Sequence, residues 1–591
     1  MPTVTEISSR YIDEVAALDP ARAERWGVAS DPTRLTDYSP AGYGELRALL
    51  QRTLDALSAA EPPRDEAERL GAGFLADWIG GEMGVIDAGE RERGLSNIVG
   101  APASIRSVFD LMDHSTPEAW EHIAARLRAV PAAMGGYRAT LELGLANGRP
   151  AARRQALVVA DQCATWAGNG DGGWFGGFVT GAAGAGADAG LRESLAAAAR
   201  DAGNAYGLLS TWLSDVYAPQ ASETDASGDE RYQAWARLLL GTDLDLDEAY
   251  AWGWEELGRL EAEKAKECAK ILPGASFLEV RELLITDPAR SVHGVDAYRD
   301  WLQAVTDEAI DGLDGSEFDI HPSIRRCDVR IPPEGSAAAA YYTTPSEDLT
   351  RPGQTWFPTV GRTRFPMWDE VSTVYHEAVP GHHLQGATIK LVPLTRAQKL
   401  GFVSAHGEGW ALYSERLMDE LGWFRTPDTR LGFLCAHAFR AARVFADIGL
   451  HTGRPIPAAG AALFPGWSGQ AGTAWSYDAA IDFIVRAGGM DHDKAESEVL
   501  RYLSWPSQAT AYKLGERTWL AGREAAKESA MAEGRPFDRK GWHARALALG
   551  PLGLKRLGAE LARIEGGTFD DHARRRKGRA AGQVSVRPGR P

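Results

Sequence analysis

Cysteine is scarce in this chain, and the few that occur do not form motifs. Cys163, Cys268, Cys327 and Cys435 are widely spaced with no CxxC pair, which argues against a disulfide framework and against a thiolate zinc site. Long apolar runs are also missing, since no stretch of about eighteen apolar residues occurs and we therefore expect no transmembrane helix. The N-terminal segment contains acidic residues and no apolar run of the signal-peptide type, which predicts a cytoplasmic protein.

Positive charge is in deficit over most of the sequence. The chain has 64 Lys and Arg against 81 Asp and Glu, a formal net charge of −17. This balance argues against nucleic-acid binding and favours simple solubility. Residues 571–591 are the exception, with seven Lys or Arg and one acidic residue. We interpret them as a disordered basic tail, with an arm that contacts RNA or a membrane as the alternative.

The spacing of apolar residues predicts helices over most of the sequence. Residues 43–60, 66–78, 191–217 and 246–272 carry apolar side chains at spacings of three and four, which is typical of helices. The glycine-rich residues 168–190 predict a loop or a pair of turns. Short strands bounded by Pro, Gly and Ser are expected within 318–360.

The length of 591 residues exceeds what one simple hydrophobic core usually supports. We therefore predict a mainly α protein with two helical lobes around a cleft. Residues 1–320 form the N-terminal helical lobe of this prediction. Residues 321–570 form a catalytic, metal-binding lobe with short strands and then helices, and residues 571–591 form the basic tail.

The segment HEAVPGHHLQ carries the clearest chemistry. His376 followed by Glu377 opens the pattern of a zinc hydrolase, a histidine ligand next to a carboxylate that can act as a general base. The usual second histidine stands four positions after the first, but that position is a proline here. Pro380–Gly381 argues against an unbroken helix. A helix with two residues looped out returns His382 to the ligand face, with His383 as a competitor.

A third ligand is expected further along the chain, because catalytic zinc normally takes three protein groups. The segment AHGEGWALYSERLMDEL is a strong helix in which Glu408 and Glu415 lie about two turns apart. We assign Glu408 to the metal and Glu415 to orienting a histidine ring. The expected cofactor is Zn²⁺, although mixed His/Glu sites also take manganese or cobalt. The remaining histidines of this region are predicted to be core or surface residues: His406, His437 and His451.

At these residues the sequence resembles the bacterial domain-of-unknown-function family eight-eight-five, for which HEAVPGHHLQ and EGWALYSE look like hallmarks. More distantly, GHHLQ resembles the second-ligand turn of helical metallopeptidases of the neurolysin and angiotensin-converting-enzyme type. EGWALYSE is similar to the segment that supplies the glutamate ligand in gluzincin aminopeptidases. The resemblance implies a zincin-like fold with a deep cleft and supports His382 and Glu408 as ligands. The Pro-Gly insertion departs from the peptidases, so their detailed activity is not carried over.

Further segments offer candidates for substrate binding. RAARVFADIGLH places Arg440 and Arg443 on neighbouring turns, where pairing with an aspartate of the same helix and a clamp on a substrate carboxylate are both open. SWPSQATAYKLGE offers Gln508 and Tyr512. The resemblance implies that Tyr512 hydrogen-bonds the oxyanion, and a core tyrosine is the alternative. Tyr342 lies in an expected strand that could pair with an extended substrate.

These observations predict a zinc-dependent metallopeptidase that hydrolyses small peptides or oligopeptides, with Glu377 as the general base. One alternative is a metal-dependent amidohydrolase acting on a non-peptide or modified amino-acid amide. Another is a non-catalytic helical metal-binding protein. The expected partner is a small peptide or amide substrate, with no nucleic acid and no membrane.

Overall fold

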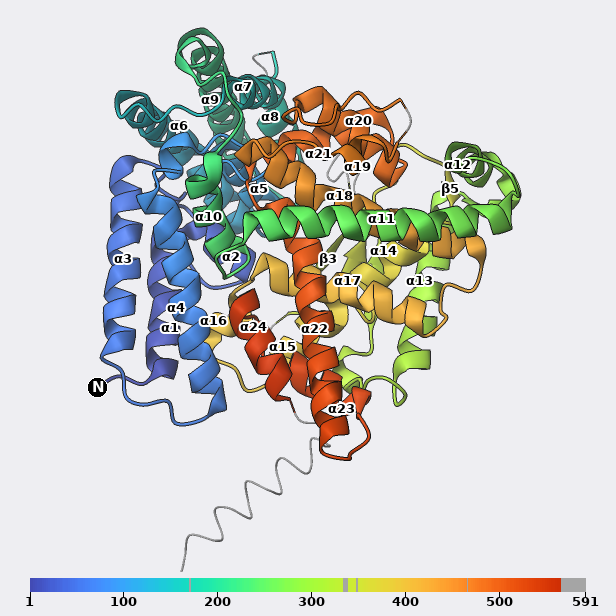
Figure 1. Cartoon of the computed structure of the whole chain (residues 1–591). Coiled ribbons are helices and arrows are strands. Elements are labelled where there is room, and N and C mark those ends of the chain that lie inside the picture. The colour runs from blue at the N-terminus through green and yellow to red at the C-terminus, as the bar shows by residue number, and fades with distance from the viewer. Residues whose placement is uncertain (170–171, 333–338, 347–348, 465, 565–591) are drawn as a thin grey trace, which may run out of the picture.

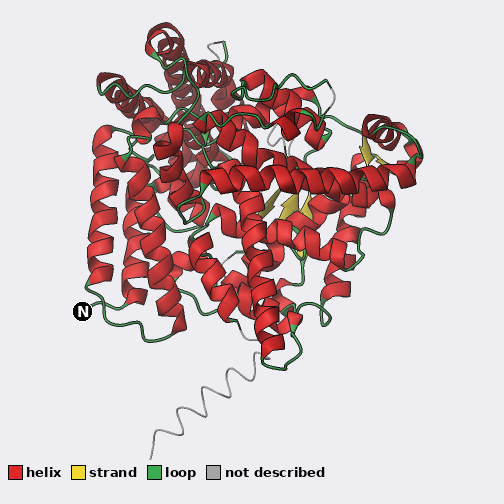
Figure 2. Ribbon diagram, viewed as in Figure 1, coloured by secondary structure: helices red, strands yellow, loops and turns green. Residues whose placement is uncertain are grey.

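Helices dominate the architecture, which confirms the mainly α prediction (Figure 2). The computed structural model describes residues 1–169, 172–332, 339–346, 349–464 and 466–564. The predicted basic tail, 571–591, lies outside the described residues. Among those described, no helix is both long enough and apolar enough to cross a lipid bilayer.

The helices before residue 320 are α1 (Val4–Leu18), α2 (Pro20–Trp26), α3 (Pro40–Ser58), α4 (Glu66–Asp87), α5 (Ala101–Leu111), α6 (Pro117–Ala146), α7 (Arg153–Ala167), α8 (Gly173–Val179), α9 (Ala189–Trp212), α10 (Gly228–Leu239), α11 (Leu246–Ile271), α12 (Phe277–Thr286) and α13 (Val295–Leu313). Side-chain caps begin many of them. Thr3 and Glu6 form a capping box at α1, and Asp245 accepts from the Glu248 N–H at α11.

The helices after the strands are α14 (Glu370–Glu377), α15 (His382–Leu391), α16 (Arg396–Leu400), α17 (Ser404–Glu420), α18 (Pro427–Thr452), α19 (Ala458–Ala461), α20 (Tyr477–Gly488), α21 (His492–Ser504), α22 (Ala511–Ala532), α23 (Arg539–Leu547) and α24 (Leu554–Arg563). Short 3₁₀ or π turns connect some elements: η1 (Arg91–Arg93), η2 (Thr180–Ala183), η3 (Leu213–Tyr217), η4 (Ala218–Gln220), η5 (Pro288–Arg290), η6 (Pro322–Ile324) and η7 (Gln508–Thr510).

The strands form two small sheets, and only the three-stranded one lies within residues 318–360, where the sequence predicted strands. Strand β4 (Gly353–Trp356) is central in the three-stranded sheet, parallel to β2 (Cys327–Arg330) and antiparallel to β3 (Tyr341–Thr343). Cys327 pairs with Gly353, and Tyr342 pairs with Thr355. A second, two-stranded sheet joins β1 (Ser291–His293) to β5 (Arg364–Pro366).

The glycine-rich residues after α7 are more ordered than the sequence predicted. Where a loop or a pair of turns was expected over 168–190, the chain forms the helix α8 before the turn η2. The prediction was wrong because aromatic side chains anchor this segment. Phe175 is fully buried, and its ring packs against those of Phe109 and Tyr206. Burial of such rings compensates the poor helix propensity of the glycines.

The described residues form two large hydrophobic cores and one small cluster around Cys268, Leu431 and Cys435. One large core is built mainly by α5–α9, the group at the top of Figure 1, and includes Ile105, Leu127 and Tyr206. The other runs from Ile7 in α1 to Ile564 just after α24. It draws residues from both sides of residue 320, so hydrophobic packing continues across the predicted lobe boundary. Where a domain boundary lies stays a prediction.

Helix α17 runs through the larger core and carries residues of the candidate site. Most of its residues are buried, including Trp410, Tyr413 and Met418. It packs along α22 and also contacts α14 and α15. A helix that is buried on every side holds its polar residues in fixed positions, because they have no solvent to turn toward.

Candidate metal centre

The helical conformation is interrupted between α14 and α15, at Ala378–Gly381. The sequence predicted a helix with two residues looped out, but here one helix ends at Glu377 and a second begins at His382. Pro380 has no N–H to continue the first helix. At Gly381 a Cβ atom would overlap the backbone oxygens of Tyr375 and His376, so only glycine allows this close approach.

Side chains of α17 hold the break in place. The Trp410 indole N–H donates to the carbonyl of Pro380 at 2.8 Å, and the Ser414 hydroxyl donates to the same carbonyl at 3.1 Å. The His383 N–H donates to the carbonyl of Ala378 at 3.0 Å. These bonds satisfy backbone carbonyl and N–H groups that have no partner within the interrupted helix. They also fix the direction of α15 relative to α14.

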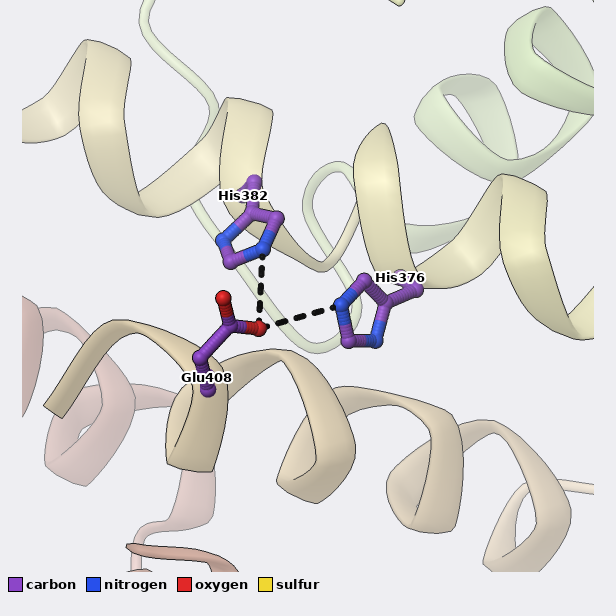
Figure 3. Close-up of side chains that lie close together, drawn as sticks. All are labelled: His376, His382 and Glu408. Atoms are coloured by element: carbon purple, nitrogen blue, oxygen red, sulfur yellow. Dashed lines mark ion pairs between the residues drawn. The ribbon is translucent and has the colours of Figure 1, made fainter. Parts of the chain in front are cut away.

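The restart brings three predicted ligands together, as Figure 3 shows. Glu408 Oε2 lies 3.4 Å from His376 Nε2 and 3.5 Å from His382 Nε2. The two imidazole rings have their centroids 4.9 Å apart and are nearly perpendicular, at 87°. One donor atom from each of the three residues lies within 4.8 Å of the other two.

The spacing of these donors fits a small tetrahedral cation. Bonds of about 2.0–2.1 Å to nitrogen and oxygen give a tetrahedron with edges of about 3.3 Å, close to the two distances from Glu408. Glu408 Oε2 is inaccessible to solvent and makes no hydrogen bond of good geometry. Burial raises the pKa of this carboxyl, but the neighbouring His376 and His382 outweigh it and lower the pKa well below its usual value. A buried, ionised oxygen between two imidazole nitrogens suits metal ligation.

Glu415 orients His376 from the opposite side. Its Oε1 accepts a hydrogen bond from His376 Nδ1 at 2.8 Å, and its Oε2 accepts one from the Ser372 hydroxyl. Burial lowers the pKa of His376, but the adjacent carboxylates of Glu408 and Glu415 raise it to about 9. This is the placement that the sequence predicted for Glu415, and it leaves Nε2 of His376 directed toward His382 and Glu408.

His383 faces away from the cluster, although the sequence left it open as the second ligand. Its Nε2 donates to the carbonyl of Ile324 at 2.8 Å, and its Nδ1 accepts from the Tyr342 hydroxyl at 3.1 Å. Both ring nitrogens are therefore engaged. Gly353 lies against this pair, and a Cβ there would overlap His383 Nδ1 and lie 2.8 Å from the Tyr342 hydroxyl oxygen. Tyr342, a predicted substrate-binding residue, is thus part of the support behind the site.

Glu377, the predicted general base, adjoins His376 at the end of α14. The residue is 7 % exposed. Within the described part of the chain, no side chain or backbone group donates a hydrogen bond to its carboxylate. The carboxylate is therefore free to accept a proton from a molecule bound beside it.

The remaining predicted substrate residues lie on α18, η7 and α22. Arg443 is buried, donates to Glu498 at 2.7 Å and to the Tyr502 hydroxyl at 3.2 Å, so its charge is balanced inside the protein. Its guanidinium also lies 4.7 Å from the ring of Tyr512. The side-chain oxygen of Gln508 is buried without a hydrogen bond. Substrate roles for these residues stay predictions.

Two further polar residues, Ser372 and His437, lie beside Glu415, and the sequence analysis missed Ser372. Ser372 lies four residues before His376, on the same helical face, and this spacing is the signal that could have found it. His437 was predicted to be a core or surface residue, and it is fully buried. Its Nε2 lies 3.6 Å from Glu415 Oε2. Its Nδ1 faces Arg416 and Lys513, and burial together with these cations lowers its pKa well below the ordinary value.

A cavity of about 720 Å³ lies elsewhere in the molecule, where α2, α3, α5 and α10 meet. Arg22, Arg93, Arg231 and Glu90 are among the residues that line it, and the three clustered ligands are not. The cavity is therefore separate from the candidate metal centre.

Comparisons with known proteins agree with the architecture. The family model described as "Bacterial protein of unknown function (DUF885)" matches residues 20–561. No functionally curated protein matches the chain. The crystal structure of a candidate lipoprotein from Colwellia psychrerythraea is similar, with a TM-score of 0.79 and 20 % identity over 95 % of this chain and 99 % of that one.

The structure of a candidate lipoprotein of unknown function from Shewanella oneidensis is also similar, with a TM-score of 0.72. The identity is 16 %, over 95 % of this chain and 100 % of that one. At these identities the likeness shows the fold. The lipoprotein description belongs to those two proteins, and a cytoplasmic location for this chain stays a prediction.

Proposed function

The chain belongs to the bacterial DUF885 family, and we propose that it is a zinc-dependent metallopeptidase that hydrolyses small peptides or oligopeptides. One observation carries the proposal. The donor atoms of His376, His382 and Glu408 lie within 4.8 Å of one another, and Glu408 Oε2 is 3.4 and 3.5 Å from the two imidazole nitrogens. Glu377 follows His376 directly, and no described residue donates a hydrogen bond to its carboxylate. Three protein ligands, rather than four, are typical of catalytic zinc.

The orientation of His383 supports a catalytic rather than a structural centre. A structural zinc site is usually closed by a fourth protein ligand. The candidate for that position, His383, instead uses both ring nitrogens on Ile324 and Tyr342. The site that we propose therefore keeps a coordination position for water or substrate.

Each residue has a defined part in the proposed reaction. His376, His382 and Glu408 would hold the ion, which supplies Lewis acidity toward water and a carbonyl when it is bound. Glu377 takes a proton from the attacking water and delivers it to the leaving amine. Glu415 and Ser372 hold the ring of His376, so that Nε2 keeps its direction during the reaction.

The proposal includes a zincin-like fold with a cleft, and a role for Tyr512 in catalysis. A zincin-like arrangement of helical lobes around a cleft would admit small peptides and exclude folded proteins. Tyr512 would stabilise the oxyanion, an effect worth about 3–4 kcal/mol when one such donor is lost. Its ring lies against Arg443, and no described residue hydrogen-bonds its hydroxyl, which is therefore available to substrate.

The test combines metal analysis with a substitution of the base. We expect purified protein to contain about one zinc per chain and to hydrolyse a mixture of short peptides, with loss of activity on chelation and recovery with zinc. Glu377→Gln should retain zinc and lower kcat by about 10²–10⁴-fold. Glu420→Gln, at the exposed end of α17, is the matched control and should behave as the parent. Hydrolysis by Glu377→Gln at the parent rate would refute the mechanism, and an amide panel tested in parallel separates peptides from other amides.

A further inference from the structure

Arg440 is a partly buried cation that has no acidic partner among the described residues. It lies in the middle of α18, where its Nη1 donates only to the carbonyl of Ala436, one turn earlier, at 3.2 Å. Its Nε is inaccessible to solvent and makes no hydrogen bond. A guanidinium that has lost part of its hydration is normally compensated by a carboxylate or by several acceptors, and here that compensation is incomplete.

Other arginines of α18 show what is missing at this position. Arg430 reaches three acidic residues, and Arg443 donates to Glu498 at 2.7 Å. Arg440 lies one turn from Arg443 on the same helix, and both guanidinium groups face the ring of Tyr512, at 5.9 and 4.7 Å from its centroid. Of these two arginines, only Arg440 has guanidinium N–H groups that no described carboxylate binds, so an external carboxylate can bind there.

The position of Arg440 links it to the candidate metal centre. His437 lies one turn before it on α18, and the side chain of His437 approaches Glu415, which binds His376. Among the described residues, no carboxylate forms an ion pair with the guanidinium of Arg440. Glu415 does not neutralise it by contact, since the carboxylate is already occupied by His376 and Ser372.

We propose that Arg440, beside the ring of Tyr512, binds the free C-terminal carboxylate of the peptide substrate. The inference rests on the proposed function and narrows its substrate class to short peptides with an unblocked C-terminus, cleaved close to that end. Arginine suits this part because its planar fork donates two parallel hydrogen bonds to a carboxylate. The carboxylate of the substrate supplies the negative charge that no described residue provides to Arg440.

The test measures binding apart from turnover. In the zinc-loaded Glu377→Gln protein, the affinities for Ala-Ala-Ala and for its C-terminal amide are compared by isothermal titration calorimetry. We expect the free acid to bind about 10- to 100-fold more tightly, the range for a hydrogen-bonded charge. Adding Arg440→Met should remove this preference, and adding Arg440→Lys should retain part of it, because lysine keeps the charge without the fork.

Matched measurements separate recognition from a purely structural role. Arg425→Met removes an exposed arginine just before α18, which forms an ion pair with Glu308 and lies over the ring of Trp423, and it should keep the full preference. Melting temperature and zinc content are measured for every variant. A preference that survives in a folded Arg440→Met protein overturns the proposal, and so does equal or undetectable binding of both peptides before that substitution.

Hydrolysis by the parent protein distinguishes failure of this inference from failure of the proposed function. Equal cleavage of the free and amidated peptides would support a peptidase and overturn carboxylate recognition. Absence of cleavage, together with a preference for the free acid that depends on Arg440, would support the carboxylate site and overturn the peptidase. Cleavage of the free acid with a KM at least tenfold below that of the amide supports both.

Discussion

Replacement of Glu415 by glutamine tests the proposal that Glu415 orients His376 to bind a metal. The substitution keeps the shape of the side chain and an oxygen that can accept from His376 Nδ1, but it removes the charge from a hydrogen bond that is 2.8 Å long and almost fully buried. Hydrogen bonds to charged groups contribute about 1.5–3 kcal/mol and neutral ones about 0.5–1.5 kcal/mol. The expected loss of about 1–2 kcal/mol corresponds to a zinc affinity about 5- to 30-fold weaker.

The assay is competition for zinc between the protein and a chromophoric chelator at constant pH. Glu420→Gln lies on the same helix away from the cluster and should bind zinc as the parent does. Glu415→Ala should lose more than Glu415→Gln, because it leaves the buried donors of His376 and Ser372 without an acceptor. Parent-like affinity in a folded Glu415→Gln protein would show that Glu415 does not prepare the ligand, and the reasoning on the site would fail.

Two further predictions concern stability. Burial raises the pKa of the Asp447 carboxyl to about 7, above the value of about 3.9 in an unfolded chain. The contribution of this carboxyl to the free energy of unfolding is therefore fully present below about pH 4. It is lost as the pH rises through 7, by about 1.4 kcal/mol per pH unit. The melting temperature of Asp447→Asn minus that of the parent should therefore rise between pH 5 and 8, and a flat difference would contradict the assignment. Gly353→Ala should lower the melting temperature by the equivalent of about 1–3 kcal/mol, because the new methyl group overlaps His383. Gly258→Ala, at an open position of α11, should raise it by the equivalent of up to about 1 kcal/mol, and shifts of the same sign for both alanines would contradict the packing argument.

Much of the architecture is local in origin and was predictable for that reason. Apolar residues at helical spacing specified α3, α4, α9 and α11, and the short strands after residue 318 were marked by proline and glycine at their ends. The prediction failed over 168–190, where glycine content suggested a loop. There the aromatic residues of α8 are held by α5 and α9, contacts that lie far away in sequence.

The sequence by itself identified the candidate residues for the proposed metal site. The succession of His376, Glu377 and a later histidine pair, followed by a helix with Glu408, specifies donors of the right type, because ligand chemistry is a property of single side chains. It also determined that Pro380–Gly381 interrupts the helix, since the missing N–H of proline is a local fact.

Only the tertiary structure decided where those side chains point. His382 and His383 are neighbours in sequence, and the choice between them depends on how α15 restarts, which Trp410 and Ser414 set from another helix. The same holds for the arginines of α18, because Glu498 from α21 reaches Arg443 and no acidic residue among those described reaches Arg440. Direction and pairing are decided by contacts between segments far apart in the chain, and the spacing of residues within one segment does not contain that information.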